Sequence, residues 1–421
     1  MRNAIIGVVI GLVLGVVSGA TVVAPRLNKA DKVNPIIGLA AQKSLDFKKL
    51  DKVINPLGQY QENADSVEKA STSNQLQIEE EKSSKPHDTG KNNSELILGP
   101  KTIHWKMASA YPSTLPQLGT LAKKFDHDIW RVSDGLLEVK FHEPGALVPP
   151  LEMFDAVRAG VIDAAFSSPG FWGNKLPALQ LFSAIPFGPP AEEFLAWIYY
   201  GGGQKLFNEI YNANGIHSIF CGLIAPEAAG WFRNRILTVE DLKGLKMRFF
   251  GLGAKVVKKL GVQTTQLTSG DIFMAFESGE IDAAEFSIPS TDLNLGLHQM
   301  IKNYYFPGWH QPSTLFELMI NLEKWNSLPA SAKAQIKAVC GDNIRQGIAE
   351  GGGTQFKALK QLQSEGVIIR RWPGEIIDAL QSAWIQVARE EAKSDHDFNR
   401  VWQSLGDFRR DYAIWHELNL Q

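Results

Sequence analysis

Two stretches of the chain carry the same pattern of apolar and polar positions. FDAVRAGVIDAAFSS begins at Phe154, and FMAFESGEIDAAEFS begins at Phe273. In both, the spacing predicts an amphipathic helix that ends at a glycine, Gly160 or Gly279, because glycine suits the left-handed position after a helix. The small apolar residues that follow predict a short strand with both faces covered. The chain therefore contains one helix-glycine-strand unit twice.

The repeated unit indicates the fold class and the place to look for a site. Two such units predict an α/β fold of two lobes, and ligands of open α/β sheets bind beyond the carboxyl ends of the strands. The first positions to consider are residues 166–172 and 285–292. The alternative is a coincidence, since this unit is common in α/β folds.

Apolar periodicity predicts the other elements. Strands are expected at 102–110, 136–141, 245–250 and 367–372, and helices at 115–133, 330–365, 374–394 and 396–418. A capping-box-like pattern from Thr238 to Asp241 predicts one helical turn. Aromatic residues at helical spacing near the C-terminus fit packing between lobes or a homodimer interface.

An arginine late in a predicted strand is the main candidate for ligand binding. Arg248 lies in strand 245–250, and Gly251-Leu-Gly253 then opens the next helix. A guanidinium fork beside the free backbone N–H groups of a helix start suits a carboxylate. The alternative is that Arg248 pairs with a structural aspartate or glutamate.

The N-terminal part of the chain differs from the rest. Arg2 precedes an uncharged apolar run, so residues 1–24 are predicted to be a signal peptide or a membrane anchor. Residues 25–98 are polar with few aromatic side chains and are predicted to be a flexible tether. Both predictions imply export.

The folded domain is expected to span residues 99–421. Its first lobe would comprise about 99–221 and its second about 222–304, each completed by later segments. The formal net charge of the whole chain is −2, and no basic stripe is present, which argues against nucleic acid as a partner. Connections between the lobes, and therefore hinges, are expected near 221–225 and 304–307.

Cysteine and histidine positions limit the chemistry. Cys221 and Cys340 are the two cysteines of the chain, and their apolar surroundings leave a disulfide and two buried thiols equally open. Neither has a cysteine or histidine at metal-ligand spacing, which argues against zinc. His310 has no readable nucleophile beside it, and the sequence carries no enzyme signature, so an enzyme is not expected.

A set of motifs from Lys101 to the C-terminus resembles one protein family. In chain order the motifs are Trp105-Lys-Met-Ala, Leu147-Val-Pro, Phe154-Asp-Ala-Val, Ile185-Pro-Phe-Gly, Tyr200-Gly-Gly-Gly, Gly230-Trp-Phe, Asp241-Leu-Lys-Gly-Leu-Lys-Met-Arg248, Gly251-Leu-Gly, Ile281-Asp-Ala-Ala-Glu285 and Tyr304-Tyr-Phe-Pro-Gly-Trp-His310. Together they resemble the solute-binding proteins of tripartite ATP-independent periplasmic (TRAP) transporters. More narrowly, they resemble the branch that binds 2-oxo acids and related monocarboxylates with a cation.

The resemblance implies a fold and a function. The fold would be the two-lobed periplasmic-binding-protein type, with a ligand cleft between the lobes and long C-terminal helices. The protein would be a periplasmic receptor that closes over a small organic acid such as pyruvate. It would deliver the acid to the membrane permease subunits of the transporter. A homodimer is compatible with the resemblance.

The resemblance also implies roles for residues of the ligand pocket. Arg248 matches the family's carboxylate-binding arginine, and Phe171 and Trp172 match its aromatic pair, with Phe171 in place of a tyrosine. Leu223 stands where the branch carries an asparagine against the ligand. The pocket would therefore lack one polar group, which leaves the identity of the acid open.

A cation site follows from the same resemblance. The branch holds a cation with a glutamine, a Glu-Trp pair and a second glutamate, and the matching positions here are Glu227, Glu285 with Phe286, and Gln311. Glutamate and glutamine are thus exchanged reciprocally between Glu227 and Gln311. Because total charge and the number of oxygen ligands are unchanged, the site would still suit Na⁺ or Ca²⁺.

Other interpretations remain open from the sequence. If no metal binds, Glu227 could hold the ammonium group of an amino acid such as glutamate while Arg248 holds its carboxylate. A structural salt bridge between Glu227 and Arg248 would weaken both ligand hypotheses. A tethered sensory binding module would have the same features as a transport receptor.

Overall fold

The computed structural model describes residues 102–419, and the side chains of residues 102–418. These residues lie in one compact unit of the chain. The predicted signal peptide or anchor, residues 1–24, and the predicted tether, residues 25–98, lie outside the described residues. Within residues 102–419, no helix is long and apolar enough to cross a membrane.

The first sheet has the strand order β2-β1-β3-β10-β4. Its strands are β1 Ile103–Ser109, β2 Leu137–His142, β3 Ala164–Ser167, β4 Ile216–Ile224 and β10 Thr314–Asn321. β1 runs parallel to both β2 and β3, whereas β10 runs antiparallel to β3 and β4. All residues of β3, β4 and β10 are buried, because helices cover both faces of this part of the sheet.

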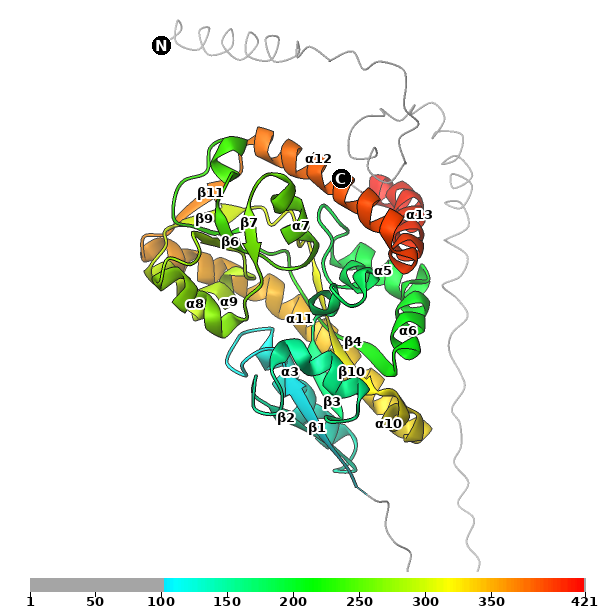
Figure 1. The fold of residues 1–421 in the computed structure, drawn as a ribbon. Coiled ribbons are helices and arrows are strands. Elements are labelled where there is room, and N and C mark those ends of the chain that lie inside the picture. The colour runs from blue at the N-terminus through cyan, green and yellow to red at the C-terminus, as the bar shows by residue number, and fades with distance from the viewer. Residues whose placement is uncertain (1–101, 420–421) are drawn as a thin grey trace, which may run out of the picture. The chain divides into compact units, whose positions relative to one another are not determined.

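The second sheet has the strand order β11-β9-β5-β8-β6-β7. Its strands are β5 Gly230–Phe232, β6 Lys246–Arg248, β7 Gln263–Thr265, β8 Ala283–Ala284, β9 Asn303–Phe306 and β11 Ile368–Arg371. β6 runs parallel to β7 and β8, and β5 runs antiparallel to β8 and β9. The two sheets form the centres of two lobes (Figure 1).

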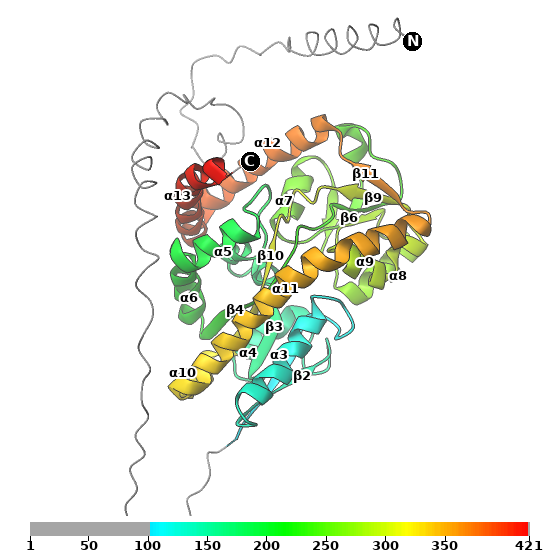
Figure 2. The ribbon, with the colours of Figure 1, turned by 180° about the vertical axis from the view of Figure 1, so that it is seen from behind.

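Helices surround the two sheets. The α-helices are α3 Gly119–Val132, α4 Met153–Arg158, α5 Ala191–Tyr200, α6 Gly203–Ala213, α7 Gly251–Lys259, α8 Ser269–Glu277, α9 Pro289–Leu295, α10 Leu322–Ser327, α11 Ala330–Ser364, α12 Gly374–Ser394 and α13 His396–Asn419. Short 3₁₀ turns are η4 Pro150–Glu152, η5 Pro169–Trp172, η6 Pro177–Phe182, η7 Val239–Leu242 and η8 Leu297–Gln299. The long α11 packs on β4 and α3 of the first lobe and on α9 of the second (Figure 2).

The repeated pattern is one structural unit in each lobe. α4 and β3 form the first copy, and α8 and β8 form the second. Gly160 and Gly279 follow the helices with φ of 72° and 75°, the left-handed conformation that their position predicts. In each copy the strand has one parallel and one antiparallel neighbour. The predicted two-lobed α/β fold is confirmed.

Most element boundaries agree with the apolar pattern, but two differ. The helix expected at 115–133 begins at Gly119, because Gln117 has a φ of 61° that no α-helix contains. The strand expected at 245–250 is paired only over Lys246–Arg248. Thr238 and Asp241 form the complete capping box that their spacing predicts.

The chain passes twice between the sheets in segments that carry candidate residues. Residues 225–229 connect β4 to β5, and residues 307–313 connect β9 to β10. These crossings adjoin the predicted hinges at 221–225 and 304–307. The first crossing contains Glu227 and the second contains Gln311.

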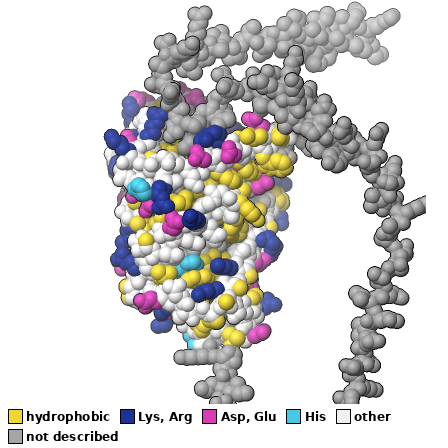
Figure 3. Space-filling view, turned by 90° about the vertical axis from the view of Figure 1, so that its right-hand side faces the viewer, with side chains coloured by type: hydrophobic (Ala, Val, Ile, Leu, Met, Phe, Trp, Pro, Cys, Tyr) yellow, Lys and Arg dark blue, Asp and Glu magenta, His cyan; other side chains and the backbone are white. Residues whose placement is uncertain are grey.

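The two cysteines form a disulfide. Cys221 in β4 and Cys340 in α11 are bonded, which decides between the two alternatives that the sequence left open. The disulfide joins the long helix to the first sheet. On the face of the molecule in Figure 3, acidic and basic side chains are interspersed, as the balanced composition leads us to expect.

Candidate functional site

A small cavity lies where the carboxyl ends of strands from both sheets meet the crossings. Its volume is about 40 Å³. Residues of both lobes and both crossings line it, among them Tyr111, Ser168, Phe171, Glu227, Arg248, Phe250, Phe286, Ser287, Gln311 and Phe316. A larger groove on the outer side of α3 has exposed walls and contains none of the predicted site residues. The cavity therefore joins both predicted site segments, 166–172 and 285–292.

Arg248 is buried at the carboxyl end of β6. Its Nη1 donates to the backbone carbonyl of Glu285 and, over 2.9 Å, to the Oε2 atom of the same residue. Its Nε donates to the carbonyl of Leu267 over 3.2 Å. Within the described chain these bonds leave Nη2 available to a ligand oxygen in the cavity. The ion pair is with Glu285, so the structural salt bridge to Glu227 that the sequence left open is not the pairing found.

Glu285 follows β8 and is fully buried. Its Oε2 also accepts a hydrogen bond from the backbone N–H of Phe250 over 3.2 Å, whereas its Oε1 has no hydrogen-bond partner among the described residues. Burial raises the pKa of Glu285, but the charge of Arg248, together with the adjacent His310 ring, outweighs burial and brings the pKa below its usual value. Arg248 thus favours the carboxylate form of Glu285.

Glu227 and Gln311 lie close together because the two crossings are hydrogen-bonded to each other. The backbone N–H of Glu227 donates to the carbonyl of Gln311, and the N–H of Gly308 donates to the carbonyl of Glu227. A Cβ atom at Gly308 would lie only 2.2 Å from that carbonyl oxygen, so this approach requires glycine. The sequence motif around Pro307 therefore has a packing reason.

The side chains of Glu227 and Gln311 share one partner. Gln311 Nε2 donates to Thr314 Oγ1 over 2.7 Å, and this hydroxyl donates to Glu227 Oε1 over 3.3 Å. Glu227 Oε2 and Gln311 Oε1 have no hydrogen-bond partner within the described residues. Burial and then the nearby Glu285 raise the pKa of Glu227 well above its usual value.

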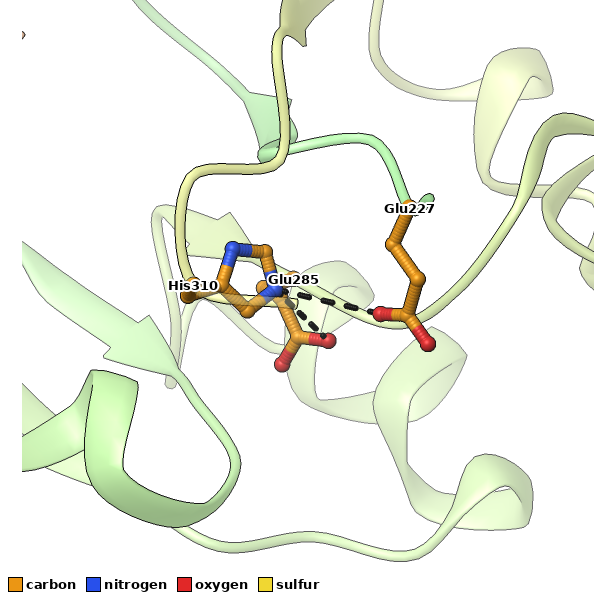
Figure 4. A group of neighbouring side chains, drawn as sticks. All are labelled: Glu227, Glu285 and His310. Carbon is orange, nitrogen blue, oxygen red and sulfur yellow. Dashed lines mark ion pairs between the residues drawn. The ribbon is translucent and has the colours of Figure 1, made fainter. Parts of the chain in front are cut away.

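The structure adds His310, which the sequence analysis treated as structural. Its Nε2 lies 3.4 Å from Glu285 Oε1 and 3.8 Å from Glu227 Oε2 (Figure 4). Ligand atoms of these three residues all lie within 4.8 Å of one another. His310 adjoins Gln311 in the motif Pro307-Gly-Trp-His-Gln, but no sequence signal places Glu285 beside its ring. The carboxylate and amide oxygens here that have no hydrogen-bond partner among the described residues would fit a cation.

The aromatic pair divides between the cavity and the lobe core. Phe171 lines the cavity, and its ring centroid lies 4.9 Å from that of Phe250. Trp172 lies behind Phe171 and donates its indole N–H to Glu317 over 2.7 Å. Leu223 is buried in β4 and is not among the residues that line the cavity.

Phe286 lies beside Arg248 and offers no side-chain atom to a cation. Its ring centroid lies 5.3 Å from the guanidinium carbon of Arg248, and its ring lines the cavity. A phenyl ring has no atom that ligates a cation, so Phe286 would serve a cation only through its backbone carbonyl. Tyr111, Ser168, Phe250 and Phe316 are lining residues that the sequence analysis did not single out, although Ser168 falls in the predicted segment 166–172.

Two α/β lobes with a small charged cavity at their junction define a class, the two-lobed solute-binding proteins. The chain belongs to the bacterial extracellular solute-binding proteins of family 7, whose model matches residues 107–395. The family of TRAP solute receptors, which the motifs resemble, is thereby confirmed. Members of this family are extracytoplasmic binding proteins.

Within the family, the chain is similar to proteins that bind or were solved with small 2-oxo acids. A monocarboxylate 2-oxoacid-binding periplasmic protein of a Nostoc species is 31% identical over 79% of this chain and 91% of its own length. A TRAP solute-binding protein from Pseudoalteromonas atlantica, solved with sodium and pyruvate, is 31% identical with a TM-score of 0.73 over 76% of this chain and 97% of that one. One from Colwellia psychrerythraea, solved with calcium and pyruvate, is 31% identical with a TM-score of 0.72 over 76% and 98%.

Proposed function

We propose that this protein is the receptor of a TRAP transporter for a small monocarboxylic 2-oxo acid of the pyruvate type, bound together with a cation. Similar proteins at 31% identity were solved with pyruvate and either sodium or calcium. The observation in this chain that carries the proposal is the cavity that Arg248, Glu227 and Gln311 line together.

The size and lining of the cavity support a small monocarboxylate. A cavity needs about 10–15 Å³ to hold one water molecule. The cavity of about 40 Å³ therefore suits an acid of few heavy atoms. Arg248 is the one cationic side chain among the described lining residues, so one carboxylate is matched. Phe171, Phe250 and Phe286 would surround an apolar substituent.

The cation would be Na⁺ or Ca²⁺, held by oxygen atoms. Glu227 Oε2, Glu285 Oε1 and Gln311 Oε1 are buried and have no hydrogen-bond partner within the described residues, and hard cations prefer oxygen ligands. The exchange of glutamate and glutamine between Glu227 and Gln311 leaves an oxygen atom at each position. We infer that the cation neutralises Glu227 while Arg248 neutralises Glu285.

A second candidate ligand is an amino acid such as glutamate, bound without a metal. Glu227 Oε2, which has no hydrogen-bond partner within the described residues, would accept its ammonium group, and Arg248 would hold its carboxylate. This candidate predicts binding that does not depend on a cation, so one titration separates the two.

A thermal-shift titration tests the proposal. The full-length chain is unfolded and refolded to remove any copurified ligand, then titrated with pyruvate, longer 2-oxo acids, lactate, succinate and glutamate, each with Na⁺, with Ca²⁺ and with chelator. At roughly 100-fold excess over Kd a ligand stabilises the native state by about 2.7 kcal/mol. Cation-dependent stabilisation by 2-oxo acids is expected, whereas a cation-independent response to glutamate alone would establish the second candidate.

Arg248 variants test the carboxylate assignment. Losing two charge-assisted hydrogen bonds, at about 1.5 kcal/mol or more each, lowers affinity by about 100-fold. Because Arg248→Ala also leaves Glu285 buried without its partner, Arg248→Lys is measured beside it, with the exposed Arg410→Ala as control. Unchanged affinity in folded Arg248→Ala would show that the acid is held elsewhere.

The proposed role in transport also concerns the N-terminal segments and the partners of the receptor. We infer that residues 1–24 and 25–98 export the receptor and tether it to the membrane, that it binds without turnover, and that it delivers the acid to the membrane permease subunits. The exposed Ile414 and Leu418 on α13 fit a homodimer interface. Deleting the neighbouring permease genes, if present, would abolish uptake by a transporter but leave a sensor's response intact.

A further inference from the structure

The strongest unexplained feature of the site is His310. This residue is only 1% exposed, yet neither ring nitrogen has a hydrogen-bond partner among the described residues. The nearest oxygens, Glu285 Oε1 and Glu227 Oε2, are the ion-pair partners of Nε2, but neither makes a hydrogen bond within the described residues. A buried polar group without a hydrogen bond costs about 1–3 kcal/mol, so two carboxylate oxygens and an imidazole nitrogen that meet without one point to a ligand that all three would share.

The orientation of the His310 ring is set by aromatic packing rather than by hydrogen bonds. Phe249 packs against it edge to face with centroids 4.9 Å apart, and Trp309 does so at 5.5 Å. These contacts aim Nε2 between the two glutamates (Figure 4). The histidine is therefore pre-positioned as a third member of the group.

The distances suit a metal ion with nitrogen and oxygen ligands. Bonds of about 2.0–2.2 Å in tetrahedral geometry place ligand atoms about 3.3–3.6 Å apart. Nε2 lies 3.4 Å from Glu285 Oε1 and 3.8 Å from Glu227 Oε2, close to this spacing, and the ligand atoms of all three residues lie within 4.8 Å of one another. Imidazole nitrogen suits zinc and related ions, whereas Na⁺ and Ca²⁺ take oxygen ligands.

We propose that His310 Nε2 joins Glu227 and Glu285 as a metal ligand, so that the site also accepts a divalent transition-metal ion such as Zn²⁺ or Co²⁺, more tightly than Ca²⁺. This inference rests on the proposed cation site and adds a nitrogen ligand to it. This ligand set contains no cysteine and comes from three separate segments of the chain, so cysteine spacing gives no information about it.

The test measures metal binding without the organic acid. The full-length chain, without a histidine tag and stripped with chelator, is titrated by calorimetry with Zn²⁺, Co²⁺ and Ca²⁺. We expect Zn²⁺ to bind at least about 100-fold more tightly than Ca²⁺, and His310→Gln to lose about 100-fold in Zn²⁺ affinity while Ca²⁺ affinity changes little. His298→Gln is the matched control, because His298 is a buried histidine beside a different glutamate, Glu365.

A spectroscopic measurement on the unaltered protein guards against a variant that fails to fold. Bound Co²⁺ with an imidazole ligand in four- or five-coordinate geometry gives strong visible absorption, whereas six oxygen ligands give weak bands. Equal Zn²⁺ and Ca²⁺ affinities, weak Co²⁺ bands, or a His310→Gln variant that loses both metals equally would each overturn the inference. Cation-dependent acid binding would then still uphold the proposed function, and its absence would refute that function separately.

Discussion

The buried carboxylates of the lobe cores and those at the junction of the lobes differ in what their oxygens contact. In the first lobe, Glu317 of β10 accepts hydrogen bonds from Trp172 Nε1 over 2.7 Å, Ser218 Oγ over 2.7 Å and Ser167 Oγ over 3.1 Å. These donors come from two strands and a 3₁₀ turn. Glu317 thus ties the core of the first lobe together.

The second lobe has a similar arrangement around Asp292 at the start of α9. Its carboxylate accepts from Trp231 Nε1 over 2.9 Å, Tyr304 Oη over 2.8 Å and the backbone N–H of Ser287 over 3.1 Å. In both lobes an indole N–H is paired with a buried acid. Each lobe core therefore supplies hydrogen-bond donors to its buried structural carboxylate.

The junction differs, because one oxygen of Glu227 and one of Glu285 make no hydrogen bond among the described residues and meet only the His310 ring, as ion pairs. The same chain that satisfies Glu317 and Asp292 leaves these atoms available in one place. Buried oxygens without a hydrogen bond require an explanation, and a bound cation, as proposed above, would supply one. Three substitutions test this contrast between the lobe cores and the junction.

The largest effect is expected in the first lobe core. Glu317→Ala removes the acceptor of three buried donors and is expected to lower the free energy of unfolding by about 3–5 kcal/mol. Glu317→Gln keeps one acceptor oxygen and serves as the comparison, with a smaller loss. Urea denaturation measures both, and a loss below about 1 kcal/mol in Glu317→Ala would remove its structural role.

Asp292 is expected to make stability depend on pH. Burial, the largest cause, raises its pKa from 3.8 to about 7. Between these two pH values the folded state keeps a proton that the unfolded state has lost. The contribution of Asp292 to the free energy of unfolding is therefore full below about pH 4 and declines as pH rises to about 7. The slope is at most about 1.4 kcal/mol per pH unit.

The measurement for Asp292 is a series of urea denaturations from pH 4.5 to 7.5. Asp292→Asn cannot titrate, so the difference in unfolding free energy between the parent protein and the variant should shrink steadily over this range. Parallel stability curves for the two proteins would mean that Asp292 does not titrate there.

The smallest effect on stability is expected at the junction, with the opposite sign. Glu227→Gln removes a buried carboxylate whose pKa is raised and is expected to stabilise the cation-free protein by about 1 kcal/mol at pH 8. The same change should abolish stabilisation by a cation. Thermal unfolding with and without Ca²⁺ checks both, with the exposed Glu277→Gln as control, and a destabilised variant that still responds to Ca²⁺ would contradict the comparison.

Much of the fold follows from local pattern. The repeated unit around Gly160 and Gly279 predicts two lobes, because a helix stop and a short apolar strand depend on neighbouring residues alone. Apolar spacing places the start of α3 too early, because it carries no information on the left-handed backbone conformation of Gln117. The sequence predicts that Arg248 lies late in a strand, because the strand and the glycine turn after it are contiguous in the chain, and the structure places it at the end of β6.

The site was predictable only where its residues belong to recognisable motifs. Glu227, Glu285 and Gln311 were singled out from such motifs, and all three lie at the junction. His310 was set aside, because a histidine alone carries no information on which acids approach it through space. The resemblance assigns Trp172 and Leu223 to the ligand pocket, but both are buried residues that are not among those that line the cavity.

By itself the sequence determined the two-lobed α/β class, the family, and the strand end that carries the arginine, because these depend on periodicity and on contiguous motifs. Only the tertiary structure decided that Cys221 pairs with Cys340, that Arg248 pairs with Glu285, and that His310 joins the two glutamates. Each of these contacts joins segments far apart in the chain. Their meeting depends on how two sheets and two crossings pack, and no local pattern encodes that arrangement.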